Sequence, residues 1–384
     1  MNIGFDAKRA IQNNTGLGNY SRYLAGILSK HYPENHYTLF APRRKHNAGL
    51  DAVIDRANTT LIFPRGLCSI FAPLWRMIGV KKDIRENNID LYHGLSNELP
   101  WGMGRSGTKT VVTIHDLIFM RYPGYYKAAD RCIYCLKAGY ACRTADRIVA
   151  VSECTKRDIM SFFHVPEQRI VVIYQGCRSS FAQSAGEDKK KDVAARYSLP
   201  RRFLLSVGTI EERKNLMLTV RALERLPGDI HLVAVGRSTR YQEEVERYAA
   251  GHALTSRLHI LNRVAADDLP AIYQLADLFI YPSFFEGFGI PIIEALSSGL
   301  PVIAARGSCL EEAGGPQSVY IDPYDARALS EAITTLLDNR EQCRRMAGAG
   351  REYVKRFSDA RIASDIIGLY NEVIGPQARS AYVR

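Results

Sequence analysis

The chain has 384 residues, more than one ordinary hydrophobic core holds, and its 46% hydrophobic and 24% charged content excludes a disordered or fibrous protein. Its formal net charge of +11 favours an anionic partner such as a phosphorylated substrate or an anionic lipid surface. No recognisable nucleic-acid module accompanies that charge, so we expect no nucleic acid partner.

The beginning of the chain is typical of a strand and not of a signal peptide. Residues 3–6 are the expected strand, and no apolar run in the sequence approaches the length of a membrane span. Cys132, Cys135 and Cys142 fall on one expected helix, where we interpret them as small buried hydrophobic residues rather than metal ligands. These features favour a cytoplasmic protein in a reducing compartment.

The first half of the chain alternates strands with helical segments. Residues 8–15 are polar and predict a loop, Gly16 and Gly18 follow it, and a helix is expected from Asn19 onward. The glycines would let the backbone approach a ligand phosphate, but an ordinary strand-to-helix loop explains this segment equally well. Further strands are expected at residues 37–41, 59–63, 91–94, 109–114, 147–151 and 169–174.

The segment from Arg65 to Arg85 mixes basic residues with apolar and aromatic ones. A basic, aromatic and partly helical segment can lie in a membrane interface. A helix that faces the core with one apolar side and exposes a basic side fits the same pattern. Both interpretations stay open, so peripheral attachment to the inner face of an anionic membrane is a hypothesis.

His115 and Asp116 follow the buried strand expected at residues 109–114. Open α/β sheets bind ligands in the crevice outside the carboxyl ends of their strands. This position makes the pair a candidate for the acceptor side of a site. A structural histidine bonded to the backbone is the alternative.

Polar residues 183–200 predict a linker between two domains, at residues 1–182 and 201–357. Residues 358–384 add an amphipathic helix that the second sheet does not require. Strands of the second domain are expected at residues 203–207, 231–235, 258–261, 278–281, 301–305 and 319–322. This alternation predicts an α/β protein with two doubly wound domains.

Arg213 and Lys214 lie in the loop GTIEERKN, directly after the first strand of the second domain. Cations at the carboxyl edge of a sheet can meet the diphosphate of a nucleotide sugar and stabilise it as it leaves. Two solvated surface charges are the alternative.

The stretch YPSFFEGFGIPIIEALSSGLPV, at residues 281–302, predicts a strand, a glycine loop, a helix and another strand. Pro291 suits the first helical turn, where free N–H groups and the helix dipole favour phosphate or sugar oxygens. Glu286 in the loop and Glu294 in the helix can accept hydrogen bonds from sugar hydroxyls. A capping glutamate and a solvated helix glutamate are the alternative for each.

These motifs together resemble the retaining GT-B glycosyltransferases of family 4, over nearly the whole chain. The stretches that carry the resemblance are TGLGNYS at 15–21, TIHDL at 113–117, SVGTIEERKNL at 206–216 and FFEGFGIPIIEALSSGLPVIA at 284–304. The resemblance implies a GT-B fold, with two facing Rossmann-like domains of parallel sheets and a deep cleft between them. It also implies that the last helix crosses back to the first domain.

The resemblance implies a role for each site residue. Glu294 would hold the nucleotide ribose and Glu286 the transferred sugar, while Arg213 and Lys214 would bind the diphosphate. His115 would act with Lys214 and Glu286 in catalysis. Many members carry an arginine where this chain has Thr209, so the diphosphate would rest more on Arg213 and Lys214. The other donor-binding residues implied are Gly16, Gly18, Val264, Gly287, Phe288 and Gly289.

The expected activity is a retaining hexosyltransferase. GDP-mannose is the expected donor, because TIHDLIF and GTIEERKN look like the bacterial mannosyltransferase branch. The acceptor would be a glycan or lipid-linked saccharide of surface polysaccharide, such as lipopolysaccharide. The chain has no D-x-D triplet, so we expect no essential metal and no cofactor beyond the nucleotide-sugar co-substrate.

Four alternatives remain open. A transferase could use a UDP-sugar such as UDP-glucose, and a GT-B sugar-nucleotide epimerase would need no acceptor. A Rossmann oxidoreductase would require an acidic residue after the second strand, where residues 42–45 read Pro-Arg-Arg-Lys. A non-catalytic glycan- or membrane-binding protein would not require the acidic and basic site residues to be intact.

Overall fold

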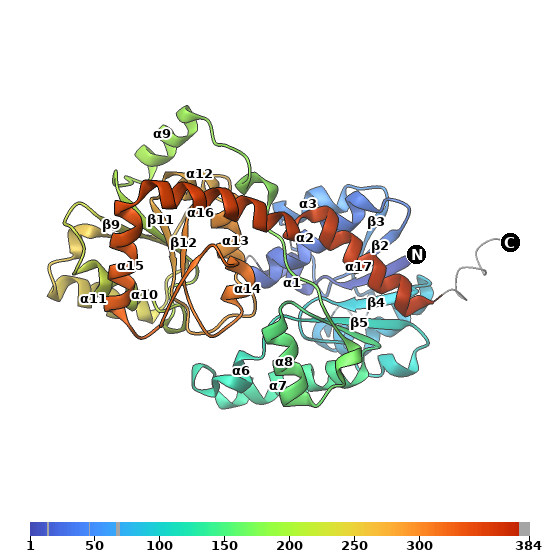
Figure 1. Cartoon of the computed structure of the whole chain (residues 1–384). Helices are drawn as coiled ribbons and strands as arrows, with labels where there is room; N and C mark the ends of the chain where they lie inside the picture. Colours follow the sequence, from blue (N-terminus) through green and yellow to red (C-terminus); the bar gives the residue numbers. More distant parts are fainter. Residues whose placement is uncertain (14, 46, 67–69, 376–384) are drawn as a thin grey trace. The chain divides into compact units, whose positions relative to one another are not determined.

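The computed structural model describes residues 1–13, 15–45, 47–66 and 70–375, which form two compact units (Figure 1). Unit 1 comprises Met1–Gln175 and the chain from Asp359 onward. Unit 2 comprises Gly176–Ser358. Each unit is built on one parallel sheet with helices around it.

The sheet of unit 1 has seven strands among the described residues, in the order β3-β2-β1-β4-β5-β6-β7. All of its pairings are parallel, so the loops that follow β1, β4 and β5 leave the same edge. The strands are β1 Asn2–Asp6, β2 His36–Phe40, β3 Thr59–Ile62, β4 Leu91–Gly94, β5 Lys109–Ile114, β6 Arg147–Ala150 and β7 Ile170–Val172.

The helices of unit 1 begin earlier than the sequence suggests. Residues 8–12, expected as a loop, form helix α1 directly after β1, because Ala10 and Ile11 are buried and Asp6 accepts a bond from the N–H of Lys8. The next helix starts at Gly16 and not at Asn19. The helices are α1 Lys8–Gln12, α2 Gly16–His31, α3 Ala48–Ile54, α4 Ala72–Leu74, α5 Val80–Glu86, α6 Ile118–Arg121, α7 Ala128–Thr144, α8 Glu153–Phe163 and α17 Asp359–Ile374, with a π-helical turn Trp75–Gly79 between α4 and α5.

The last helix, α17, belongs to unit 1, where it lies along α2 (Figure 1). Its apolar face is buried, and the hydroxyl of Tyr370 lies 2.6 Å from Nδ1 of the buried His93 on β4. The hydroxyl of Tyr23 on α2 donates to Asp359 at 2.7 Å. Helix α17 therefore packs with the N-terminal part of the chain in unit 1.

The sheet of unit 2 has six strands among the described residues, all parallel, in the order β10-β9-β8-β11-β12-β13. The strands are β8 Phe203–Val207, β9 His231–Val235, β10 Leu258–Leu261, β11 Leu278–Tyr281, β12 Val302–Ala305 and β13 Val319–Ile321. The helices are α9 Glu187–Arg196, α10 Leu216–Leu223, α11 Arg240–Gly251, α12 Leu269–Leu275, α13 Ile290–Ser297, α14 Leu310–Gly314, α15 Ala326–Asp338 and α16 Arg340–Tyr353.

The segment expected as a linker, residues 183–200, differs from that prediction. It contains α9, which belongs to unit 2 and packs on α12. Asp268, only 2% exposed, pairs with Lys189 and accepts bonds from Arg196 at 2.6 Å and Tyr197 at 2.9 Å. The charged residues that suggested a linker therefore form ion pairs with Asp268, which attach α9 to unit 2.

The segment from Arg65 to Arg85 divides into a buried and an exposed side. Arg76 is 7% exposed and pairs with Asp6 at 2.5 Å and with Glu98 at 2.6 Å, so its charge lies in the interior, whereas both interpretations of the sequence placed the basic side chains outside. Lys82 and Arg85 are exposed. The described part of the chain contains no helix with both the length and the apolarity needed to cross a bilayer. The large apolar side chains that are exposed in the described part of the segment are those of Ile70, Phe71, Leu74 and Ile78, while Leu67 lies outside the described residues.

The three cysteines expected to be buried differ in exposure along α7. Cys142 is fully buried, Cys135 is partly buried, and Cys132 is exposed. The expectation of burial is therefore wrong for Cys132, because the first half of α7 presents most of its side chains to solvent.

Candidate functional site

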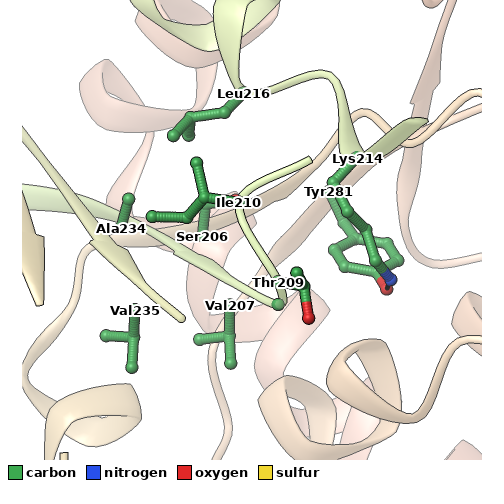
Figure 2. A pocket seen from close by; sticks show the side chains of 10 residues that line it. Ser206, Val207, Thr209, Ile210, Lys214, Leu216, Ala234, Val235 and Tyr281 are labelled. Carbon is green, nitrogen blue, oxygen red and sulfur yellow. Dashed lines mark hydrogen bonds between the residues drawn. The ribbon is translucent and has the colours of Figure 1, made fainter. Parts of the chain in front are cut away.

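A pocket lies in unit 2 at the carboxyl ends of β8, β9 and β11 (Figure 2). The loop after β8 turns at Gly208, whose φ of +151° favours glycine. It packs against the end of β9, where a Cβ on Gly236 would lie 1.7 Å from the carbonyl oxygen of Gly208. These two glycines hold the loop over the sheet edge. The lining residues include Val207, Thr209, Lys214, Ala234, Val235 and Tyr281.

Three side chains converge on the carboxylate of Glu286. Nζ of Lys214 lies 2.5 Å from Oε1 of Glu286. The same Nζ donates to the hydroxyl of Tyr281 at 2.5 Å, and Figure 2 shows the side chains of Lys214 and Tyr281 next to each other. Nη1 of Arg213 lies 2.8 Å from Oε2 of Glu286. The Tyr281 hydroxyl in turn donates to Oε1 at 3.3 Å. The structure thus brings the predicted residues Arg213, Lys214 and Glu286 together at this edge of the sheet.

The charges of this cluster decide which groups are ionised. Burial alone would raise the pKa of Glu286, but Arg213 and Lys214 outweigh it and lower the pKa to about 2. Burial lowers the pKa of Lys214, against the attraction of Glu286. Glu211 lies 2.6 Å from Arg213 and offsets part of its charge. An ammonium has three N–H donors, so Lys214 retains one for a ligand oxygen beyond Glu286 and Tyr281.

The loop from Glu286 to Gly289 leads into α13 with its backbone held in place. Sγ of Cys309 donates to the carbonyl oxygens of Glu286 and Phe288 at 3.1 and 2.9 Å. Phe288 is 3% exposed and packs edge-to-face on Phe357, so its ring belongs to the core of the unit. Gly289 has a φ of +129° and caps a helix that lacks a side-chain cap. Gly287 lies within the same loop.

Glu294 is half-buried on α13 and has different partners from Glu286. The hydroxyl of Tyr273 donates to its Oε2 at 2.9 Å. Burial raises the pKa of Glu294 to about 7, against smaller opposing effects of Tyr273 and Arg178. Glu294 therefore changes charge near neutral pH, whereas Glu286 does not.

Two further predicted donor residues lie at the carboxyl edge of the same sheet. Thr209 lines the pocket one residue after Gly208. Val264 follows β10 and is partly buried. Their positions allow contact with a ligand at this edge, but only Thr209 borders the pocket.

His115 is buried in unit 1, with both ring nitrogens occupied. Nε2 donates to the carbonyl oxygen of Leu95 at 2.9 Å, and Nδ1 accepts from the amide of Gln175 at 2.9 Å. The ring of Tyr20 contacts it edge-on, with centroids 4.6 Å apart. Burial lowers the pKa of His115 to about 4, although the bond to Leu95 opposes the shift. His115 is therefore neutral at pH 7 and is not poised as a general base.

The other predicted residues of unit 1 lie at the same edge of its sheet. Oδ1 of Asp116 accepts from the N–H of Ile118 at 3.2 Å at the start of α6. Gly16 and Gly18 form the first turn of α2, and a Cβ on Gly18 would lie 1.8 Å from the carbonyl oxygen of Asn13. The glycine at position 18 is thus required by packing, while a Cβ on Gly16 would meet nothing within 4 Å.

Sequence reasoning missed Tyr281, Tyr273 and Gln175. Tyr281 ends β11, and only its position at a strand end beside the Glu286 loop could have signalled a role. Tyr273 and Gln175 are distant in sequence from the glutamate and histidine that they bind, and no motif marks them. Among the described residues, no cluster of three or more His, Cys, Asp or Glu side chains could hold a metal ion.

Two family models together match most of the chain. Residues 15–180 match the model described as Glycosyltransferase Family 4, and residues 188–353 match Glycosyl transferases group 1. These ranges contain the predicted site residues of unit 1 and unit 2, respectively.

The chain is also similar to characterised relatives. It is 30% identical over 294 residues to O-antigen chain mannosyltransferase B of Escherichia coli, covering 75% of each chain. It is 27% identical over 279 residues to the serotype-specific mannosyltransferase WbdA of Escherichia coli, covering 70% of this chain but only 33% of that longer relative. The solved structure of Anabaena HepE in complex with UDP and glucose matches with a TM-score of 0.75 at 17% identity, over 97% of this chain and 100% of that one.

The fold expected from the sequence, with two Rossmann-like domains of parallel sheets, is therefore confirmed. The family model matches and the relative at 30% identity confirm the resemblance as well. The chain belongs to the group 1 glycosyltransferases of family 4, with a GT-B fold.

Proposed function

We propose that this glycosyltransferase moves mannose from GDP-mannose to a glycan or lipid-linked saccharide during surface polysaccharide synthesis. The 30% identity to an O-antigen chain mannosyltransferase supports the sugar and the class of acceptor. The reaction proceeds with retention of the anomeric configuration and without an essential metal ion.

The observation that carries this proposal is the cluster of Arg213, Lys214, Tyr281 and Glu286 at the carboxyl edge of the sheet in unit 2. Lys214 and Arg213 are suited to the diphosphate, whose negative charge grows as the bond to the sugar breaks. Glu286, ionised and held by three donors, is suited to accepting hydrogen bonds from sugar hydroxyls. Glu294 on α13 is suited to the ribose.

The electrostatics favour a front-face route. Glu286, shared between two cations, is a weak nucleophile, and its pKa of about 2 prevents it from donating a proton at neutral pH. His115 is neutral, with both ring nitrogens bonded. The leaving phosphate oxygen would therefore accept the proton of the attacking hydroxyl, while positioning and cations lower the barrier.

A thermal-shift screen over GDP-, UDP- and ADP-sugars tests the donor. GDP-mannose should raise the melting temperature most, because a ligand that binds only the folded state stabilises it by mass action. Glu294→Ala should abolish that shift. A larger shift with UDP-glucose would replace the proposed donor by the UDP-sugar alternative.

Product analysis tests the reaction itself. GDP-mannose with a mannose-containing oligosaccharide should yield an α-linked product by NMR, since the donor is the α-anomer. GDP-mannose alone should remain unchanged apart from slow hydrolysis. Isomerised sugar nucleotide in that second sample would instead identify an epimerase.

We also propose that unit 1 associates with an anionic membrane through the segment from Arg65 to Arg85. Phe71 and Leu74 are 62% and 56% exposed, next to exposed Lys82 and Arg85. Apolar side chains flanked by lysine and arginine suit the interface of an anionic bilayer. Replacing both Phe71 and Leu74 by serine should reduce co-sedimentation with vesicles rich in phosphatidylglycerol. Equal sedimentation of variant and parent would refute this attachment.

A further inference from the structure

An exposed pair of aromatic rings lies at the carboxyl edge of the sheet in unit 2. Tyr324 follows β13 and is 78% exposed, the largest fraction among the large hydrophobic side chains that the structure describes. Its ring lies against that of Phe284, with the centroids 5.1 Å apart and the planes tilted by 33°. Phe284 is partly buried and supports the tyrosine ring, most of which remains open to solvent. Exposed apolar surface next to a functional site indicates a place where a ligand binds.

Hydrogen bonds join this ring pair to the loops of the Glu286 cluster. The N–H of Phe284 donates to the carbonyl oxygen of Arg213 at 2.9 Å. In return, Nη1 of Arg213 donates to the carbonyl oxygen of Phe285 at 2.6 Å. Phe284 is also only two residues before Glu286 in the chain. The aromatic pair is therefore continuous with the candidate site and is not an isolated patch elsewhere on unit 2.

Asn215 fixes the loop of Tyr324 against the loop of Phe284. Its side-chain amide donates to the carbonyl oxygen of Pro282 at 3.1 Å and to that of Pro323 at 2.8 Å. Asn215 is 6% exposed, so both bonds are largely shielded from water. The two rings consequently have a fixed backbone on both sides, which lowers the entropy that a ligand must overcome when it binds them.

The polar groups beside Tyr324 are carboxylates. Asp322 and Asp325 are both exposed, and each uses one oxygen for a backbone N–H: that of Tyr324 at 2.9 Å and that of Ala328 at 2.9 Å, respectively. An ionised carboxylate has about four acceptor positions, so each retains capacity for a ligand hydroxyl. Two negative charges beside an apolar ring disfavour a phosphate or an anionic lipid. They suit a neutral ligand that presents both C–H groups and hydroxyls.

We propose that Tyr324, supported by Phe284 and flanked by Asp322 and Asp325, is a subsite for one hexose ring of the acceptor glycan. The face of an aromatic ring is negative, and the C–H groups of a pyranose carry a small positive charge, so the sugar can lie on the tyrosine ring. Its hydroxyls can donate to the two carboxylates. The sugar held there is not the one that reacts. The choice of an acceptor glycan rests on the proposed function.

Steady-state kinetics of the full chain test the subsite, with GDP-mannose and a mannose-containing oligosaccharide as substrates. Tyr324→Ser removes the ring, and Tyr324→Trp keeps an aromatic face. Tyr248→Ser is the matched control, because it removes a tyrosine ring that stacks on His252 near the end of α11, which leads back to the start of β10. Thermal unfolding verifies that each variant is folded.

Tyr324→Ser should raise the KM for the oligosaccharide about 5- to 30-fold, as expected when the face on which a sugar lies is lost. The kcat at saturating acceptor and the calorimetric Kd for GDP should stay within about twofold of the parent, because the reacting groups are unchanged. Tyr324→Trp should retain most of the affinity for the acceptor, and Tyr248→Ser should behave as the parent does. A merely structural role of Tyr324 would instead change kcat, KM and the melting temperature together.

The subsite is refuted if Tyr324→Ser leaves the KM for the oligosaccharide within about twofold of the parent. Weaker binding of GDP with an unchanged acceptor KM would also overturn it, since the ring would then stack on the nucleobase.

Direct binding separates this proposal from the proposed function. Saturation-transfer NMR with mannose-, glucose- and galactose-containing oligosaccharides requires no turnover. If GDP-mannose is not used but one of these oligosaccharides binds the parent and not Tyr324→Ser, the proposed donor is wrong and the subsite stands. If mannose is transferred but oligosaccharide binding is the same in both proteins, the subsite is wrong and the proposed function stands. Absence of oligosaccharide binding to the parent contradicts the subsite as well.

Discussion

At the scale of single residues, Glu286 and Glu294 show how neighbours decide the chemistry of a carboxylate. They are eight positions apart in one loop–helix segment. Glu286 lies between Arg213 and Lys214, which lower its pKa to about 2 in spite of burial. The carboxylate of Glu294 accepts a bond from the hydroxyl of Tyr273, and burial raises its pKa to about 7.

The pKa of Glu294 predicts a pH dependence of donor binding. The ionised carboxylate accepts bonds from two ribose hydroxyls, so binding favours the deprotonated form, and affinity should fall up to about tenfold per pH unit below pH 7. Calorimetric Kd values for GDP between about pH 5.5 and pH 8 measure it. Glu294→Gln should bind more weakly at pH 8, without this slope. A slope that persists in Glu294→Gln would assign the titration to another group.

Lys214 is predicted to act in the transition state more than in binding. Replacing it with glutamine removes the cation nearest Glu286, and kcat should fall by about 10²–10³, as when one group that stabilises developing charge is lost. Glu211→Gln, which removes a charge from the other side of Arg213, should change kcat by less than about tenfold. Steady-state kinetics with the donor compare them. An equal loss in both variants would point to a general disturbance of the loop.

Among the helices and strands, the junction of α1 and α2 requires a glycine at position 18 but not at position 16. A Cβ at position 18 would overlap the carbonyl oxygen of Asn13, whereas one at position 16 would meet nothing within 4 Å. The backbone of α1 must move if residue 18 carries a side chain.

Gly18→Ala should therefore lower the free energy of unfolding by about 1–3 kcal/mol, as overpacking does. Gly16→Ala should leave it within about 1 kcal/mol, because alanine has the higher helix propensity and no clash. Urea denaturation of the two variants provides the comparison. Equal destabilisation by both changes would contradict the packing described for this junction.

A buried series of hydrogen-bonded polar side chains connects α17 to the sheet of unit 1. His93 lies between Tyr370 on α17, at 2.6 Å, and Thr113 on β5, at 2.8 Å. Thr113 also contacts the hydroxyl of Tyr20, 3.1 Å away, whose ring packs on His115. The C-terminal helix is thereby connected to the residue predicted to face the acceptor.

Tyr370→Phe should destabilise unit 1 by about 1–3 kcal/mol, because it leaves a buried nitrogen of His93 without a partner. Tyr23→Phe removes the hydroxyl that donates to Asp359 in a less buried place, and should cost less than about 1 kcal/mol. Urea unfolding followed by fluorescence measures both. A smaller effect of Tyr370→Phe than of Tyr23→Phe would show that the hydrogen bond between Tyr370 and His93 adds little to the stability of unit 1.

At the scale of the whole molecule, the two units differ in how the chain builds them. Unit 2 is one continuous segment, whereas unit 1 needs both ends of the sequence. The isolated segment 176–358 should therefore fold and bind GDP, since its core and the Glu286 cluster lie within it. Deleting residues 359–384 should instead destabilise unit 1, because α17 no longer covers its apolar partners. Circular dichroism and GDP titration of the isolated segment test this; an unfolded segment would refute it.

Much of the fold and part of the site were predictable from the sequence. Strands such as residues 203–207 and 278–281 are short apolar runs bounded by turns, and their order implied parallel sheets. The loops after them placed Arg213, Lys214 and Glu286 at one edge, and the structure joins these three. The prediction was poorer where composition alone was used, as for Arg76 and for α9, because a charged side chain can equally be solvated or paired in the interior.

Local geometry and periodicity are enough to predict the alternation of strands and helices, the glycines of the turns and the residue types at each strand end, so the amino-acid sequence alone specifies these features. The folded structure was needed to show that Tyr281 contacts Lys214 and Glu286 and that the side-chain amide of Gln175 donates to Nδ1 of His115. Hydrogen bonds and pKa values depend on distances between residues far apart in the chain, and those distances exist only once the sheets have formed.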